Sequence, residues 1–327
     1  MLPVLVPAPS YVRAVVSAIN TASSRVCIAA YLFQPGSATE PIITALKDAA
    51  IRGVSVSIIA DYSTYFHDAG ALVPPHFRSS MVRQLNHMSR QLRDHGVDIH
   101  WVGLGTLAFL YAGRTHSKWI VADSTVFCFG GINLDAMTAS YTDYMIQYDD
   151  ERLADIIFLE HQSIVRADAL ATGTTSSDYT INGGTVLIDG GIPGDSVIYR
   201  RALTLARSAR HITLVSQYCP SGTLASTIGA TSHDIYYNQP SSTELLTRLL
   251  ISANQHRYGV RSSYHRAPYL HAKFMIVTDH TGHKTAITGS HNFISFGGLL
   301  GTREIALETS DPHLISQLES FLTRYVA

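Results

Sequence analysis

Lysine is the scarcest charged residue in this chain of 327 residues. Lys47, Lys118, Lys273 and Lys284 are the only lysines, so arginine carries most of the positive charge. Charged residues make up only 15% of the chain, and its formal net charge is −1. Non-specific capture of nucleic acid relies on a strongly basic surface, so this composition argues against that class of function.

Cysteine is also rare, and long apolar runs are missing. Cys27, Cys128 and Cys219 each lie in or near an apolar segment. This pattern indicates buried free thiols in a reducing compartment. No run is long enough to cross a bilayer, and the first residues lack the basic and apolar regions of a signal peptide. We therefore expect a cytoplasmic globular protein with a large core in one or two domains.

One stretch collects residues that suit phosphate chemistry. His116 and Lys118 are separated by one residue, and on a strand this spacing places both side chains on one face. Asp123 predicts a turn after the strand. Gly131 would let the backbone approach a ligand closely, and Asn133 adds an amide. A single hairpin could thus present an imidazole, an ammonium and an amide to one point.

A second stretch repeats this arrangement. His271 and Lys273 are again separated by one residue, and Ser290 and Asn292 follow at a similar distance. Two histidines can divide a substitution into two steps, one acting as nucleophile and the other as acid and base. Lysines and asparagines can hold an anionic group such as phosphate. This layout predicts phosphoryl transfer without a metal or another cofactor.

The chain also repeats at the level of its secondary structure. Residues 196–219 align without a gap on residues 10–33, helix on helix and strand on strand. Such an internal duplication predicts two similar α/β units. We expect an N-terminal domain at 1–172, a linker at 173–195 and a C-terminal domain at 196–327, with mixed, largely parallel sheets.

The doubled motif resembles the signature of the phospholipase D superfamily, H-x-K-x4-D-x6-G-[GS]-x-N, which is present twice in that family. The first copy matches throughout, with Asp123 as its aspartate. In the second copy Thr278 occupies the aspartate position and Asp279 follows it. The family's aspartate is mainly a structural turn residue. The runs 53–61 and 289–293 make the chain most similar to bacterial cardiolipin synthases and related phospholipase D-like proteins.

This resemblance implies two similar domains related by a pseudo-two-fold axis, with both motifs at their interface. It implies exchange on a phosphodiester through a covalent phosphohistidine, with His116 as nucleophile and His271 as general acid and base. Lys118 and Lys273 would bind the phosphate oxygens together with further groups of the two motifs. The phosphate-binding set would be Asn133, Asn292, Gly131 and Ser290, the histidine-orienting carboxylates Asp143 and Glu304, and the structural acids Asp123 and Asp279.

The substrate class follows less directly from the sequence. The near-neutral charge, the apolar segment 104–111 and the likeness to cardiolipin synthases favour a phospholipid substrate and peripheral contact with a membrane. Either hydrolysis or phosphatidyl transfer would fit. The first alternative is a nuclease or other phosphodiesterase, for which the only dense basic cluster is the helix 200–210. The second is a non-catalytic binding protein. The long segment 62–79 is either functional or a surface excursion.

Overall fold

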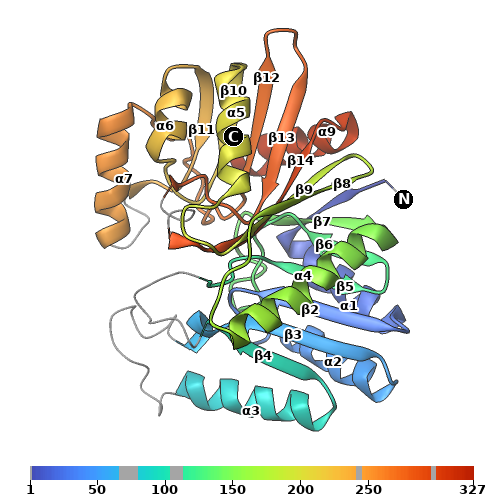
Figure 1. Cartoon of the computed structure of the whole chain (residues 1–327). Helices are drawn as coiled ribbons and strands as arrows, with labels where there is room; N and C mark the ends of the chain where they lie inside the picture. Colours follow the sequence, from blue (N-terminus) through green and yellow to red (C-terminus); the bar gives the residue numbers. More distant parts are fainter. Residues whose placement is uncertain (1, 66–79, 104–112, 241–244, 296–299) are drawn as a thin grey trace.

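The computed structural model describes residues 2–65, 80–103, 113–240, 245–295 and 300–327. Within them the chain forms two seven-stranded sheets, one from each half of the sequence. Figure 1 shows the second half, coloured yellow to red, stacked on the first half, coloured blue to green. The predicted α/β fold with two similar halves is confirmed.

The first sheet has the strand order β1-β7-β6-β5-β2-β3-β4. Its strands are β1 (Val4–Pro7), β2 (Arg25–Ala30), β3 (Ser55–Asp61), β4 (Asp98–Val102), β5 (Trp119–Ala122), β6 (Thr125–Cys128) and β7 (Tyr144–Asp149).

The second sheet has the order β11-β10-β12-β13-β14-β9-β8. Its strands are β8 (Ser177–Ile181), β9 (Gly184–Gly190), β10 (Ala209–Val215), β11 (Ser232–Tyr236), β12 (Phe274–Asp279), β13 (Lys284–Gly289) and β14 (Arg303–Thr309). Six strands correspond in both sheets, in the order β3-β2-β5-β6-β7-β1 and β11-β10-β12-β13-β14-β9. The duplication therefore extends to the topology.

The sheets are mixed, as predicted, but they are not largely parallel. Only β2 with β3, β3 with β4, and β10 with β11 run parallel; the other neighbouring strands are antiparallel. Helices connect the parallel strands, whereas short turns connect β5 to β6 and β12 to β13, and a short turn can only join antiparallel strands. The hairpins of the motif segments thus lower the proportion of parallel strand pairs in both sheets.

The predicted linker, 173–195, is more than a connection. It carries β8 and β9, and β9 pairs along β14 from Arg303 to Glu308. Strand β9 precedes its helix as β1 precedes α1, so β9 is the counterpart of β1. The sequence indicates a short strand at 185–188, but the Gly, Thr, Ser and Asp residues around it obscure its correspondence with β1. The domain boundaries themselves stay a prediction.

Helices α1, α2 and α3 cover the outer face of the first sheet, and α5 and α6 cover that of the second, whereas α4 and α9 pack in the core between the sheets. Helix α1 packs on α2, and α5 packs on α6. The Ser196 hydroxyl accepts a hydrogen bond from the Tyr199 N–H and so caps α5. The described helices are α1 (Ala8–Thr21), α2 (Glu40–Ile51), α3 (Ser80–Asp94), α4 (Glu151–Ala169), α5 (Val197–Arg207), α6 (Gly222–Gly229), α7 (Leu245–Tyr258) and α9 (Pro312–Phe321).

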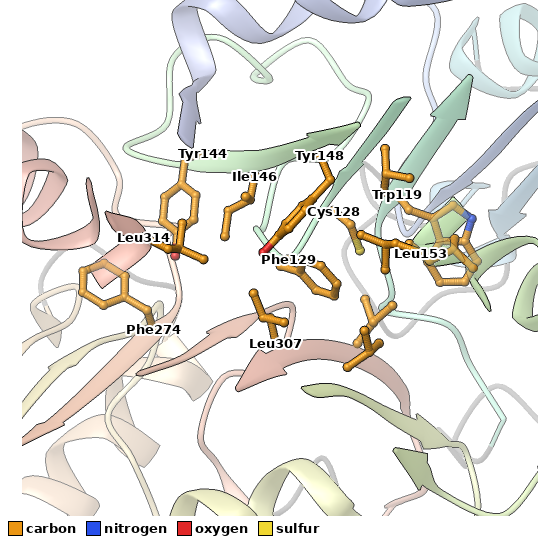
Figure 2. Close-up of a cluster of buried hydrophobic side chains, with 14 of the residues drawn as sticks. Trp119, Cys128, Phe129, Tyr144, Ile146, Tyr148, Leu153, Phe274, Leu307 and Leu314 are labelled. Carbon is orange, nitrogen blue, oxygen red and sulfur yellow. The ribbon is translucent and has the colours of Figure 1, made fainter. Parts of the chain in front are cut away.

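One apolar core joins the two halves. Phe129 and Tyr144 of the first half belong to the same buried cluster as Phe274 and Leu307 of the second, as Figure 2 shows. The Tyr144 hydroxyl lies 2.5 Å from that of Thr288, which donates to the Phe129 carbonyl at 2.8 Å. Buried apolar area is the main favourable term in such packing. The two sheets therefore fix each other, and with them the ends of the strands that carry the motifs.

Candidate active site at the junction of the two halves

Each motif histidine lies just before a central strand, and the other half holds it there. The His116 N–H donates to the Arg303 carbonyl at 2.8 Å, and the His271 N–H donates to the Thr142 carbonyl at 3.0 Å. The residues before the histidines form isolated parallel bridges with Arg303 and Thr142. Backbone hydrogen bonds between the halves therefore position both imidazoles.

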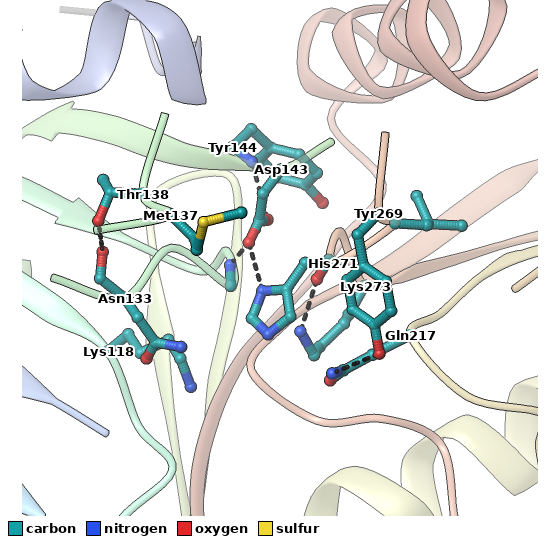
Figure 3. Close-up of polar contacts among 12 residues, drawn as sticks. Lys118, Asn133, Met137, Thr138, Asp143, Tyr144, Gln217, Tyr269, His271 and Lys273 are labelled. Carbon is teal, nitrogen blue, oxygen red and sulfur yellow. Dashed lines mark hydrogen bonds and ion pairs between the residues drawn. The ribbon is translucent and has the colours of Figure 1, made fainter. Parts of the chain in front are cut away.

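The carboxylates that orient the imidazoles are also exchanged between the halves. Nδ1 of His116 lies 3.0 Å from Oε2 of Glu304. Nδ1 of His271 lies 2.6 Å from Oδ2 of Asp143, as Figure 3 shows. All four residues are largely buried. A carboxylate on Nδ1 fixes the tautomer and leaves Nε2 available for reaction. Both acids are predicted for this role, but the sequence does not indicate that each lies against the histidine of the opposite half.

Both motif lysines are buried in the site. Their Nζ atoms donate to the carbonyls of His116, at 2.7 Å from Lys118, and of His271, at 2.5 Å from Lys273. Burial, followed by repulsion from Lys273, lowers the pKa of Lys118 to about 7. Burial lowers the pKa of Lys273 to about 8, against the attraction of Asp143 and Glu304. Two buried ammonium groups that repel each other form a site that favours an anion.

The same environment affects the histidines. Burial and the charge of Lys273 lower the pKa of His271 to about 3, although Asp143 opposes the change. Burial also lowers the pKa of His116, against the attraction of Glu304. Burial disfavours ionised Glu304, but His116 more than offsets this and brings its pKa to about 2. A bound anion would stabilise the protonated imidazoles, because it would compensate the lysines.

Gly131 and Ser290, predicted to bind phosphate, contact the carboxylates of Asp143 and Glu304. The Gly131 N–H donates to Oδ1 of Asp143 at 3.2 Å, and the Ser290 hydroxyl donates to Glu304. Ser290 is fully buried. The two residues occupy equivalent positions of the motif, so each half holds its own acid for the other half's histidine. Their role in binding phosphate stays a prediction.

The motif asparagines lie at the ends of the same turns. Oδ1 of Asn133 accepts a long hydrogen bond of 3.4 Å from the Leu32 N–H, and Figure 3 shows its side chain beside Lys118. Oδ1 of Asn292 is buried and has no hydrogen-bond partner among the residues described. Their role as phosphate ligands stays a prediction.

Asp123 and Asp279, the two predicted structural acids, accept hydrogen bonds from different parts of the chain. Asp123, at a positive φ of 53°, accepts hydrogen bonds from the N–H groups of Ser23, Ser24 and Arg25. Burial opposes its charged form, but those N–H groups outweigh burial and lower its pKa. The Asp279 carboxylate lies at the surface and bonds within its own turn, to Thr281 and His283. Asp123 therefore joins distant segments, while Asp279 closes a hairpin.

Several residues near the site were missed in the sequence. The Tyr31 ring lies 5.1 Å from the His116 ring, and the Tyr141 ring lies 5.6 Å from the His271 ring. Buried Arg303 donates to the Gly113 and Thr172 carbonyls. The alignment of 10–33 on 196–219 could have indicated Tyr31, because it follows a strand that neighbours the motif. Nothing in the sequence marked Arg303.

Two segments singled out in the sequence cannot be compared with the structure. The apolar segment 104–111 and most of the segment 62–79 lie outside the described residues. In the described ranges, no group of three or more His, Cys, Asp or Glu side chains could hold a metal ion. The helices of those ranges also include none with the length and hydropathy needed to span a membrane.

Comparison with known proteins agrees with this architecture. The family described as cardiolipin synthase, PLD-like domain, matches residues 15–158. The chain is similar to phosphatidylserine synthase of Haemophilus influenzae Rd KW20, with a TM-score of 0.76 and 13% identity, covering 99% of this chain and 87% of that one. It is also similar to polyphosphate kinase of Porphyromonas gingivalis, with a TM-score of 0.64 and 16% identity, covering 97% of this chain and 46% of that one. A search of curated protein sequences gives no significant match.

The duplicated fold and the facing histidine motifs define a protein suited to phosphodiester chemistry. The family match lies in the first half of the chain, at residues 15–158, and it agrees with the resemblance to the phospholipase D superfamily that the motifs predict. At these identities the solved structures establish the fold, and the substrate has to be argued from the site.

Proposed function

We propose that this protein transfers or hydrolyses phosphatidyl groups of phospholipids through a covalent phosphohistidine. The observation that carries the proposal is the crossed pairing of His116 with Glu304 and of His271 with Asp143. It supplies two imidazoles of fixed tautomer beside two buried lysines. That set is what a two-step displacement at phosphorus requires.

In the first step, Nε2 of His116 attacks phosphorus and a P–N bond forms. The bond from phosphorus to the headgroup oxygen breaks, and the headgroup leaves as an alcohol after taking a proton from Nε2 of His271. Glu304 stabilises the positive charge that develops on His116. Lys118 and Lys273 stabilise the charge on the phosphoryl oxygens, and Asn133 and Asn292 donate hydrogen bonds to them.

In the second step, His271 removes a proton from the incoming nucleophile. The new oxygen forms a bond to phosphorus, and the P–N bond to His116 breaks, which regenerates the enzyme. Water as nucleophile gives hydrolysis, and an alcohol gives transfer. The two histidines, His116 and His271, and the two lysines, Lys118 and Lys273, supply the proton transfers and the positive charge of both steps. The proposed mechanism therefore requires no metal ion.

The charge distribution favours a phospholipid over a nucleic acid. Arg200 pairs with Asp195 at 2.9 Å, and Arg201 pairs with Glu308 at 2.6 Å. The only dense basic cluster is thus partly neutralised by its neighbours, which argues against an electrostatic track for a nucleic-acid backbone. The matching family and the similar phosphatidylserine synthase both carry the names of phospholipid enzymes, which supports the same choice. We expect the protein to contact membranes peripherally.

The test is the phosphoenzyme. On vesicles with a radiolabelled phospholipid phosphate, wild-type protein should release headgroup and keep its rate in excess chelator. His271→Ala should accumulate acid-labile, base-stable phosphate on the protein, because it can attack but cannot complete the second step. His116→Ala should not accumulate it, and exposed His87→Ala should behave as wild type. If labelled phosphate accumulates on His116→Ala instead, His271 is the nucleophile and His116 is the general acid and base. If the protein cleaves DNA but no phospholipid, the proposed phospholipid substrate is wrong. If it cleaves no phosphodiester of any kind, a non-catalytic binding protein is the remaining alternative.

A further inference from the structure

The duplication places different residues at one equivalent position beside the two histidines. In the alignment of 10–33 on 196–219, Tyr31 corresponds to Gln217. Each lies two residues after an equivalent paired strand residue: Ala29 pairs with Trp119, and Val215 pairs with Phe274. Trp119 and Phe274 are each three residues after their motif histidine. Gln217 thus relates to His271 as Tyr31 relates to His116.

On the His116 side, this position presents an aromatic ring. The Tyr31 ring meets the His116 ring edge-on at 5.1 Å between centroids. Nζ of Lys118 lies 5.6 Å from the centre of the same ring. An aromatic face beside an ammonium stabilises the cation but cannot pair with the hydroxyls of a substrate through the ring.

On the His271 side, the position offers hydrogen bonds. Nε2 of Gln217 donates to the Tyr269 hydroxyl at 3.3 Å, and the Tyr269 ring lies 5.4 Å from that of Tyr141, which covers His271. Figure 3 shows Gln217 and Tyr269 together on the Lys273 side of His271. Gln217 and Tyr269 are only partly buried, so a ligand can reach them.

The Gln217 backbone is fixed in place. Nδ2 of buried Asn238 donates to the Gln217 carbonyl at 2.9 Å and to the Leu270 carbonyl at 2.7 Å. Oδ1 of Asn238 accepts from the Leu270 N–H at 2.9 Å. One amide therefore ties Gln217 to the residue before His271. Among the described residues, Oε1 of Gln217 has no hydrogen-bond partner, so the side chain retains an acceptor.

We propose that Gln217, together with Tyr269, recognises the hydroxyl groups of the alcohol that leaves from, or attacks, the phosphorus on the His271 side. The preferred alcohol would be a polyol such as glycerol. The inference rests on the proposed function, in which His271 protonates that alcohol. A carboxamide has both donors and an acceptor, so it can bond two neighbouring hydroxyls at once. A simple alcohol of the same length leaves those groups unpaired, which reduces its rate.

Two substrates of equal charge test this. Vesicles would contain either phosphatidylglycerol or phosphatidyl-n-propanol, whose headgroups differ only by two hydroxyls. Wild-type protein should have the higher kcat/KM for release of glycerol. Gln217→Leu should lower the glycerol-to-propanol ratio about tenfold, the usual effect of one or two partly exposed hydrogen bonds. Tyr269→Phe should lower it in the same direction. The control is Gln162→Leu, a matched change on the exposed face of α4, which should keep the wild-type ratio.

The outcomes separate the two proposals. Equal release of both alcohols by wild type, or an unchanged ratio in both Gln217→Leu and Tyr269→Phe, overturns the inference and leaves the proposed function standing. If wild type cleaves neither lipid nor any other phosphodiester, the proposed function itself fails. A ratio compares two substrates on one protein sample, so partial unfolding of a variant does not imitate the effect. Should Gln217→Leu not fold, Tyr269→Phe alone decides the matter.

Discussion

His116 and Glu304 are 188 positions apart in the sequence, yet Nδ1 of one lies 3.0 Å from a carboxylate oxygen of the other. The same relationship joins His271 to Asp143 across 128 positions. Neither half alone contains an oriented histidine. The proposed reaction would therefore depend on the shared core between the sheets, because small shifts there would separate both pairs.

Glu304→Gln should keep the fold and lose most of the activity. The amide is of equal size but does not stabilise a cationic imidazole, and loss of the carboxylate in a histidine pair of this kind costs about 10³- to 10⁴-fold in kcat. Glu308→Gln is the matched control, since Glu308 lies on the same strand and pairs with Arg201 at the surface. Steady-state kinetics on a phosphodiester check this. A Glu304→Gln rate within a few fold of wild type would show that the pair only positions the chain.

Lys118→Met should abolish activity and raise the thermal midpoint. The pKa of Lys118 is lowered to about 7 in the folded chain by burial and by Lys273. The unfolded chain therefore binds more protons above that pH, and folding gains stability as pH rises toward the ordinary lysine pKa. Removing the charge relieves the same cost at neutral pH, and about 1 kcal/mol corresponds to a Tm rise of about 1–3 °C in a chain of this length.

The control for that change is Lys284→Met. Lys284 is half-exposed and pairs with Glu319 at 2.5 Å, so its loss should not raise the midpoint or stop the reaction. Thermal unfolding at pH 7 compares the two variants. A lower midpoint for Lys118→Met would mean that its hydrogen bond to the His116 carbonyl outweighs its desolvation.

Binding of a phosphodiester should weaken as pH rises from 7 to 9. The pKa values of Lys118 and Lys273 are lowered to about 7 and about 8, so both lysines lose their protons across this window in the empty site. A bound anion favours the protonated lysines, and binding near pH 8 should therefore take up protons. Dimethyl phosphate keeps one negative charge throughout, and calorimetry in buffers of different ionisation enthalpy counts the protons. Constant affinity with no uptake would contradict the lowered pKa values.

The motif residues could be located from the sequence because their spacing repeats. The same spacing could not show that Glu304 and Asp143 are exchanged between the halves, since pairing across a domain interface leaves no local periodicity. The motif position of Ser290 predicts phosphate binding, whereas its hydrogen bond to Glu304 is recognisable only in three dimensions. The helix-and-strand alternation predicted the parallel pairs correctly, and the motif spacing predicted a hairpin, but the prediction of largely parallel sheets did not allow for the antiparallel pairs that such hairpins add.

Asp123→Ala should destabilise the protein without changing the chemistry of the molecules that stay folded. Asp123 accepts from three N–H groups ahead of β2 and occupies a positive φ. Losing such charge-assisted bonds should cost about 2–3 kcal/mol. Asp279→Ala should have a much smaller effect, because the Asp279 carboxylate lies at the surface and bonds within its own turn. Urea unfolding compares them, and kcat per folded molecule should match wild type in both. Equal destabilisation would mean that the second turn is also tied to the fold.

Gly131→Ala should impair the site while the sheet stays folded. A Cβ on Gly131 would lie 2.7 Å from Oδ2 of Asp143, 2.8 Å from the His271 carbonyl oxygen and 2.9 Å from Nζ of Lys273. These groups are fixed by hydrogen bonds to one another, so relief requires the His271–Asp143 pair to shift. A displacement of about 1 Å can cost about a hundredfold in rate.

Gly36→Ala is the matched control for Gly131→Ala, because an added Cβ there meets only Ala136, at 4.0 Å. It should keep wild-type kcat. Far-UV circular dichroism and the thermal midpoint establish folding for both variants before kinetics are compared. If Gly131→Ala retains wild-type kcat, the second histidine site tolerates a shift in its geometry, and the fixed position of Asp143 is not what sets the rate.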